Sequence, residues 1–379
     1  MKTIGAALRE NGGSGPGFDA LRLTLAFSVL AWHCFSITSG DQASPTHGLG
    51  WMIVYATVPM FFALSGFLVT PTAARLTLGR FVLARGLRIV PPLMIGAAAC
   101  VLGLGLAFTT LPPLDYLTHP DTLAYWRTAL CDIHYRLPGV FEDTPLPQVN
   151  ASLWTIPAEI VCYAALAGLI AVRRVVWWPA PALGIVVLFG VDQAWSAFGH
   201  SWSFPFEKQF AGESGKLICI FLVGALAWLQ RDRIPLSPVL AGLATGGLAL
   251  FTTFGSSALA TNPAFVGFAS VALTYLVIWL GMLKAPLPWP LNTGSYSYGL
   301  YLYGFPIQQA VVHLTGTRSP MVVLAWSVPL GLLMAFLSWH GIEKPMQDLR
   351  RRITRSTRRA DRDSTGSGGD AVMDPASSR

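Results

Sequence analysis

The feature that most constrains this chain is the placement of its apolar residues, which fall into blocks of about 20 with almost no charge inside them. A helix of that length can cross the hydrocarbon core of a bilayer. Of the 379 residues, 53% are hydrophobic and only 12% are charged, whereas an ordinary soluble domain carries about 25% charged residues. Too few charged side chains remain to cover a soluble protein. The sequence therefore predicts an all-α integral membrane protein.

The apolar blocks divide the chain into about ten expected transmembrane helices. The fifth and sixth blocks are short, so we expect those helices to be tilted, re-entrant or displaced by several residues. The expected spans lie near 20–38, 51–71, 89–109, 153–172, 175–191, 216–230, 236–254, 263–283, 295–314 and 320–340.

The basic residues indicate an orientation. With the N-terminus in the cytoplasm, 21 of the 26 Lys and Arg residues fall on the inner side of these spans. This is the asymmetry that cytoplasmic loops show. An even number of spans then places both termini in the cytoplasm.

Three parts follow along the chain. Residues 1–19 form a cytoplasmic N-terminal segment, residues 20–345 the transmembrane domain, and residues 346–379 a cytoplasmic tail. The tail is basic at first, which suits anionic headgroups, and is then rich in Ser, Gly and Asp, which predicts disorder. The outer loop 110–152 is long enough to form a partial lid, and any chemistry must take place in the bundle.

Neither charge nor cysteine content indicates a different class. The net charge of +7 does not predict nucleic-acid binding, because the basic residues lie in short loops and the tail without interleaved aromatic residues. The five cysteines show no C-x-x-C spacing, which gives no sign of a disulfide framework or a structural zinc site. We expect no metal and no permanently bound cofactor.

Polar residues inside the apolar blocks are the functional candidates, because burial in a membrane makes them costly. Arg22 and His33 are eleven residues apart, so they share one helix face at a distance of about 16 Å along the axis. A neutral imidazole at that depth can act as a general base, and a histidine satisfied by a neighbouring helix is the alternative. Glu159 lies two turns inside the fourth span, where it either holds the histidine tautomer or forms a structural ion pair.

Two further patterns each have a functional and a structural interpretation. Ser65 and Gly66 form a small polar notch that suits either an acyl chain or close helix packing. Arg85 and Arg88 are i, i+3 neighbours at the cytoplasmic edge, where they provide either a two-pronged phosphate site or ordinary positive-inside anchoring.

Taken in order, these motifs resemble those of the membrane-bound acyltransferase 3 family. The Phe-Asp-Ala-Leu-Arg run that leads from residue 18 to His33 resembles the Arg-x10-His signature of the family. The resemblance covers about residues 15–348. Five later motifs follow in family order: Phe-Phe-Ala-Leu-Ser-Gly-Phe at 61–67, Arg-Gly-Leu-Arg-Ile-Val-Pro at 85–91, Ser-Leu-Trp at 152–154 with Glu at 159, Tyr-Leu-Tyr at 301–303 before Phe-Pro, and Glu-Lys-Pro at 343–345.

The resemblance implies an O-acyltransferase that moves an acyl group, usually acetyl, from acyl-CoA to a hydroxyl of a cell-surface or exported glycan. It implies a multi-pass protein of the bacterial inner (plasma) membrane, with acetyl-CoA as donor substrate, a carbohydrate acceptor, and polysaccharide biosynthesis machinery as a further partner. Carried over by motif, His33 and Glu159 are the catalytic candidates, and the other candidates fall into two groups. The acyl-CoA contacts are Arg22, Arg85 and Arg88, and the substrate-binding candidates are Asp19, Ser65, Trp154 and Tyr301.

One departure and three alternatives stay open. Many family members have a histidine where Gly304 stands, so either Tyr301 or Tyr303 replaces it or its role is dispensable. An acyl-histidine intermediate is an alternative to direct transfer. A transporter or flippase for a glycan or lipid-linked sugar is the main alternative to an enzyme, although the two halves show no internal repeat. A non-enzymatic subunit of a polysaccharide assembly complex is a third hypothesis.

Overall fold

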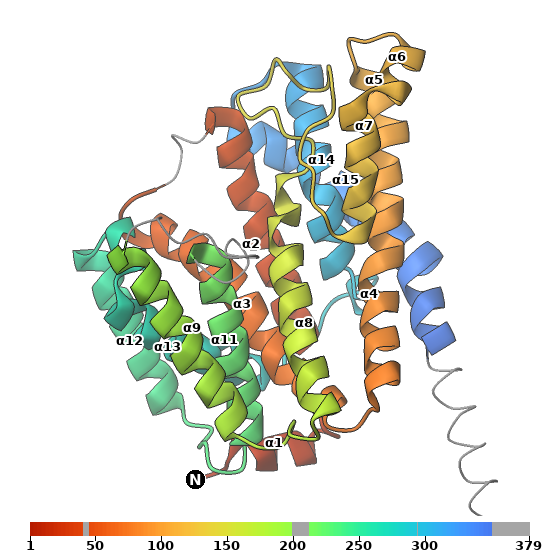
Figure 1. The fold of residues 1–379 in the computed structure, drawn as a ribbon. Helices are drawn as coiled ribbons and strands as arrows, with labels where there is room; N and C mark the ends of the chain where they lie inside the picture. The colour runs from red at the N-terminus through yellow and green to blue at the C-terminus, as the bar shows by residue number, and fades with distance from the viewer. Residues whose placement is uncertain (41–44, 199–211, 294, 351–379) are drawn as a thin grey trace, which may run out of the picture.

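The chain forms a bundle of helices (Figure 1), seen here in a computed structural model that describes residues 1–40, 45–198, 212–293 and 295–350. Within these residues there is no β-strand, only two isolated bridges, Thr3 with Pro235 and His47 with Ser256. The all-helical membrane class is confirmed. Most of the predicted tail, residues 351–379, lies outside the described residues, and the last described helix runs to Arg350, past the predicted boundary at 345.

Six helices of the described chain are long and apolar enough to cross a membrane. Each overlaps one of the expected spans. They are α2 (Phe18–Ser39), α3 (Gly48–Ala73), α4 with its extension through a π-helix and α5 (Leu78–Phe108), the 3-10 turn η4 with α8 (Ala151–Ala171), α13 (Pro263–Gly281), and α15 with its extension (Pro320–Arg350).

The remaining four expected spans also lie on helices. These are α9 (Pro179–Phe198), α11 (Gly212–Leu229), α12 (Pro238–Phe254) and α14 (Ser297–Thr315). That the chain crosses the membrane ten times, with both termini in the cytoplasm, remains a prediction.

Short helices lie at the two ends of the bundle (Figure 1). We call the end with α1 (Ile4–Glu10) and the turn at 230–237 the basic end, which is the predicted cytoplasmic side. The opposite end, the loop end, carries α6 (Pro113–Thr118), α7 (Pro120–Tyr125) and the irregular segment 131–150.

Helix α1 docks a segment whose sequence is fairly polar. Ile4 is 1% exposed and Ala7 2%, and the backbone amide of Ile4 donates to the carbonyl of Ile234 at 3.0 Å. Arg9 pairs with Asp232 at 2.6 Å. The N-terminal segment is therefore fixed against the turn between α11 and α12.

Helix α4 begins at Leu78, eleven residues before the apolar block at 89–109. The early turns carry arginines that lower the hydropathy, yet their apolar side chains still face the core. Phe81 is 1% exposed and Ala84 3%, and Ile89 continues that face at 4%. Amphipathic spacing, rather than mean hydropathy, sets where this helix starts.

Helices α3 and α11 pack at backbone distance through two glycines. A Cβ placed on Gly66 would lie 1.9 Å from the carbonyl oxygen of Phe221, and one on Gly224 would lie 2.1 Å from that of Ala63. Small residues allow this approach between membrane helices. The contact places Ser65 and Phe221 side by side next to the centre of the bundle.

Candidate functional site

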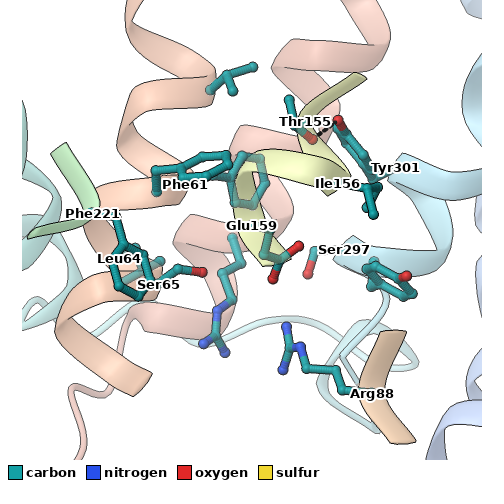
Figure 2. Close-up of a pocket in the computed structure, with 14 residues that line it drawn as sticks. Phe61, Leu64, Ser65, Arg88, Thr155, Ile156, Glu159, Phe221, Ser297 and Tyr301 are labelled. Atoms are coloured by element: carbon teal, nitrogen blue, oxygen red, sulfur yellow. Dashed lines mark hydrogen bonds between the residues drawn. The ribbon is translucent and has the colours of Figure 1, made fainter. Parts of the chain in front are cut away.

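A small chamber lies where α2, α3, α4, α8, α11 and α14 meet (Figure 2). Its volume is about 90 Å³, which is room for several water molecules. One part of the wall is apolar and the other carries hydroxyls, two guanidinium groups and one carboxylate. The lining residues are Arg22, Val58, Phe61, Phe62, Leu64, Ser65, Arg88, Thr155, Ile156, Glu159, Phe221, Ser297, Tyr298 and Tyr301.

The charged groups of the chamber come from three helices. Glu159 accepts a hydrogen bond from the hydroxyl of Tyr163, one turn further along α8, at 2.5 Å. Its carboxylate also interacts electrostatically with Arg88 of α4, and Figure 2 shows it pointing towards Ser297. Arg22 of α2 is held by Asp19 at 3.3 Å. With two cations and one anion, the chamber favours a negatively charged guest.

Arg85 and Arg88, predicted as a pair, lie in different surroundings. Arg88 lines the chamber, whereas Arg85 is 8% exposed and lies over the rings of Phe81 and Tyr163, at 5.8 and 5.5 Å from their centroids. Arg85 thus packs against the tyrosine that holds Glu159. The two guanidinium groups do not form one two-pronged surface in this structure.

A second cavity, the vestibule, adjoins the chamber on its α4 side. It has a volume of about 100 Å³ and shares Arg88 and Tyr298 with the chamber. Arg350, from the last described turn, contributes a further cation. The whole lining is Ala84, Leu87, Arg88, Ser295, Tyr298, Glu343, Met346, Gln347 and Arg350. Arg88 therefore lies in the wall of both cavities.

His33 lies on the same helix as Arg22 but does not line the chamber. Its ring meets Phe305 of α14 edge to face, with centroids 5.1 Å apart. Within the described residues His33 makes no hydrogen bond and does not contact Glu159. The expected support of the imidazole by that carboxylate is not formed here, since Glu159 is bonded to Tyr163 instead.

The other predicted substrate-binding residues fall in different places. Ser65 and Tyr301 line the chamber, and the Tyr301 hydroxyl bonds Thr155 at 2.6 Å and the carbonyl of Ser152. Asp19 stays outside it and holds Arg22. Trp154 packs against the core, and its neighbour Thr155 reaches the chamber instead. Close helix packing at the notch is confirmed, because Gly66 packs against α11. Binding of an acyl chain there stays a prediction, and Ser65 lines the chamber.

The glycine that departs from the family pattern closes a helix contact. A Cβ on Gly304 would lie 2.6 Å from the side chain of Leu30, so α14 packs tightly against α2 one turn before His33. Tyr303 is 6% exposed and belongs to the core, so Tyr301 is the tyrosine of this motif that faces the chamber.

Three hydroxyl-bearing residues of the chamber were not predicted from the sequence. Ser297 and Tyr298 precede Tyr301 by one turn of α14, and Thr155 ends the 3-10 turn before α8. The i, i+3 spacing of Tyr298 and Tyr301 was the available signal. This spacing did not indicate a site by itself, because tyrosine is common at membrane interfaces.

The comparison with known proteins decides the class. An acyltransferase domain family, acyltransferase 3, matches residues 16–340. This chain belongs to that acyltransferase family. It is similar over 92% of its length, at 28% identity, to "Nodulation protein 10" of Rhizobium leguminosarum bv. viciae, of which it covers 97%. It is similar at 23% identity over 86% of its length to an "O-acetyl transferase" of Shigella phage Sf6, of which it covers 94%.

The remaining similarity is local. A stretch of 99 residues is 34% identical to the fluoride-specific ion channel FluC of Acidithiobacillus ferrooxidans, which is 24% of this chain and 79% of that protein. No solved structure matches the chain significantly. The near-complete matches show that the protein is an acyltransferase with membrane helices.

Proposed function

We propose that this acyltransferase takes an acetyl group from acetyl-CoA at the basic end and places it on a hydroxyl of an exported glycan at the loop end. The observation that carries the proposal is the position of Arg88, which lines both the vestibule and the chamber. Guanidinium groups bind phosphate oxygens in a bidentate manner. Arg88, Arg22 and Arg350 would hold the phosphates of CoA at the entrance.

The distance between Arg22 and His33 gives the two residues separate tasks. They are about 16 Å apart along α2, so they cannot contact the same group. The slender pantetheine arm of CoA would run from the arginines along α2 and bring the thioester towards His33. Because the chamber holds only about 90 Å³, its side chains must move to admit the arm.

His33 would act as the general base in this proposal. Its imidazole takes the proton of the acceptor hydroxyl, the oxygen attacks the thioester carbonyl, and CoA leaves as a thiolate. A neutral imidazole without a hydrogen-bonding partner is free to accept that proton. Glu159 would contribute indirectly by keeping the guanidinium of Arg88 in place in the chamber. The hydroxyl of Tyr163 would fix the carboxylate of Glu159.

The relatives support the same reaction class. One of them is named an O-acetyl transferase, and the acetyl donor fits the limited space of the chamber. We place the protein in the inner membrane, with polysaccharide assembly enzymes as the source of its acceptor. A transporter gains no observation from the described residues that acyl transfer does not also explain.

The test uses the full-length protein in lipid nanodiscs with radiolabelled acetyl-CoA. Arg88→Ala should weaken acetyl-CoA binding about 10- to 100-fold, because it removes a charge-assisted hydrogen bond worth about 1.5–3 kcal/mol. Arg75→Ala is the matched control, since Arg75 is an exposed arginine that bonds only the carbonyl of Pro71. His33→Ala should bind acetyl-CoA normally and lose turnover. Equal binding by the two arginine variants, or full turnover by His33→Ala, would refute these roles.

A further inference from the structure

The segment at the loop end encloses a cavity that the acyl-transfer proposal does not use. It has a volume of about 570 Å³ and lies between α7 and the irregular residues 133–148. That volume is within the range of pockets that enclose small organic ligands. It exceeds the chamber and the vestibule several times over.

The polar groups of this outer cavity are free to bind a guest. Nε2 of His134 is buried without a hydrogen bond, and the nearest carboxylate, that of Asp132, is 3.7 Å away. Within the described residues, the side chains of Tyr135, Arg136 and Gln148 make no hydrogen bond or ion pair. A folded protein normally satisfies a buried polar group such as Nε2 of His134. The half-buried Tyr135 and Gln148 and the exposed Arg136 beside it are free to bond a ligand in place of water.

The backbone around these side chains is held in place. The amide of Val149 donates to the carbonyl of Tyr135 at 2.6 Å, and that of Thr110 to the carbonyl of Gly139 at 3.0 Å. Gln309, fully buried on α14, donates to the carbonyl of Gln148 at 2.6 Å and also to that of Leu146. These hydrogen bonds attach the backbone of the cavity wall to the helix bundle, and the positions from which the free side chains extend are therefore fixed.

The charges of the lining select the kind of guest. Asp121 and Glu142 line the cavity together with Arg136, and Oε1 of Glu142 accepts the amide of Gly139 at 3.1 Å. Two carboxylates would repel a phosphate or a carboxylate, and Arg136 would repel a cation. A neutral molecule with many hydroxyls can bind to both the negative and the positive groups of the lining, because hydroxyls donate to carboxylates and accept from guanidinium and amide groups. The ring of Tyr135 offers an apolar face for the C–H groups of a sugar.

One short stretch of chain joins the lining of the outer cavity to that of the chamber. Gln148 lines the cavity and Thr155, seven residues later, lines the chamber. The side-chain amide of Asn150 donates to the carbonyl of Leu302 at 2.9 Å. The hydroxyl of Tyr301 bonds the same stretch at Ser152 and Thr155.

We propose that the outer cavity is the subsite for the acceptor, where His134, Tyr135, Arg136 and Gln148 bind a neutral pyranose of the glycan and aim its hydroxyl at the Tyr301 side of the chamber. This inference rests on the proposed function for the identity of the reaction. The binding of the sugar itself does not depend on it.

The test measures sugar binding and acetyl transfer separately, with methyl glycosides of glucose, galactose, rhamnose and N-acetylglucosamine as probes. Saturation-transfer NMR on the full chain in nanodiscs detects binding without acetyl-CoA. Mass spectrometry then follows transfer from acetyl-CoA to the glycosides that bind. The variants are Arg136→Ala/Gln148→Ala and, as the matched control on the same loop, Asp115→Ala, whose side chain is exposed and outside the cavity.

We expect the double variant to lose the NMR signal and to raise the KM for glycoside about tenfold or more, with slow acetyl-CoA hydrolysis unchanged. The control should match the wild type in both. Unchanged glycoside binding in the double variant, no binding of any neutral glycoside, or stronger binding of methyl glucuronide or inorganic phosphate would overturn the proposal. Glycoside binding without acetyl-CoA turnover would refute the proposed function and leave the sugar site standing.

Discussion

Replacing Gly66 by alanine tests the packing that places the chamber between α3 and α11. The added Cβ would lie 1.9 Å from the carbonyl oxygen of Phe221, whereas ordinary contact begins at 3.4 Å. The obstacle is backbone, so the two helices must separate by about 1.5 Å, the difference between these distances. A gap of 1 Å already removes up to about half of the dispersion energy of a contact.

The expected cost is about 3 kcal/mol in the free energy of unfolding, at the upper end of overpacking effects. Gly246→Ala is the matched control, because Gly246 is an exposed residue inside α12 with no atom near its missing Cβ. That change should stabilise the protein by about 0.5–1 kcal/mol through helix propensity alone. The two variants should therefore differ by about 4 kcal/mol.

Titration with SDS in mixed micelles, followed by circular dichroism, measures both variants against the wild type. Separation of the helices should also widen the chamber, because Ser65 of α3 and Phe221 of α11 both line it. If Gly66→Ala is as stable as Gly246→Ala, the two helices do not pack at backbone distance and the chamber is not built as described.

Three further outcomes follow from particular contacts. The Arg9 guanidinium holds the pKa of Asp232 below its usual value, so docking of α1 should be fully present above pH 4 and weaken as the pH falls through the lowered pKa; limited proteolysis of residues 1–10 should show this pH dependence, and Asp232→Asn should remove it. Phe61→Ala should enlarge the chamber and raise turnover of butyryl-CoA relative to acetyl-CoA, and an unchanged ratio would show that this ring does not limit the acyl group. Tyr301→Phe keeps the ring but loses the bonds to Thr155 and Ser152; we expect faster acetyl-CoA hydrolysis as water enters from the loop end, and an unchanged hydrolysis rate would contradict a closing role for the hydroxyl.

Hydropathy predicted the positions of the helices well, because a membrane span is a property of consecutive residues. The block at 263–283 became α13 at Pro263–Gly281 with almost the same ends. The start of α4 could not be predicted in this way, since the arginines of its first turns lower the mean hydropathy while Phe81 and Ala84 still face the core. Helix α1 was not predicted either, because its burial depends on a turn more than 200 residues further along the chain.

The sequence by itself determined the class of protein, the helical segments and the family, because these depend on composition, local period and motif order. It also predicted Arg22, Arg88, Glu159, Ser65 and Tyr301 as site residues, and the structure places these five around one chamber. Only the tertiary structure decided which neighbours share a task.

Arg85 and Arg88 are three residues apart, yet one packs on Tyr163 and the other lines the chamber. His33 and Glu159 looked like a catalytic pair, yet they have different partners. The outer cavity came entirely from the fold, because Gln309 and a distant loop build it together. Side-chain pairing between helices depends on their rotation and separation, and glycine contacts such as Gly66 and Gly304 set these distances in three dimensions.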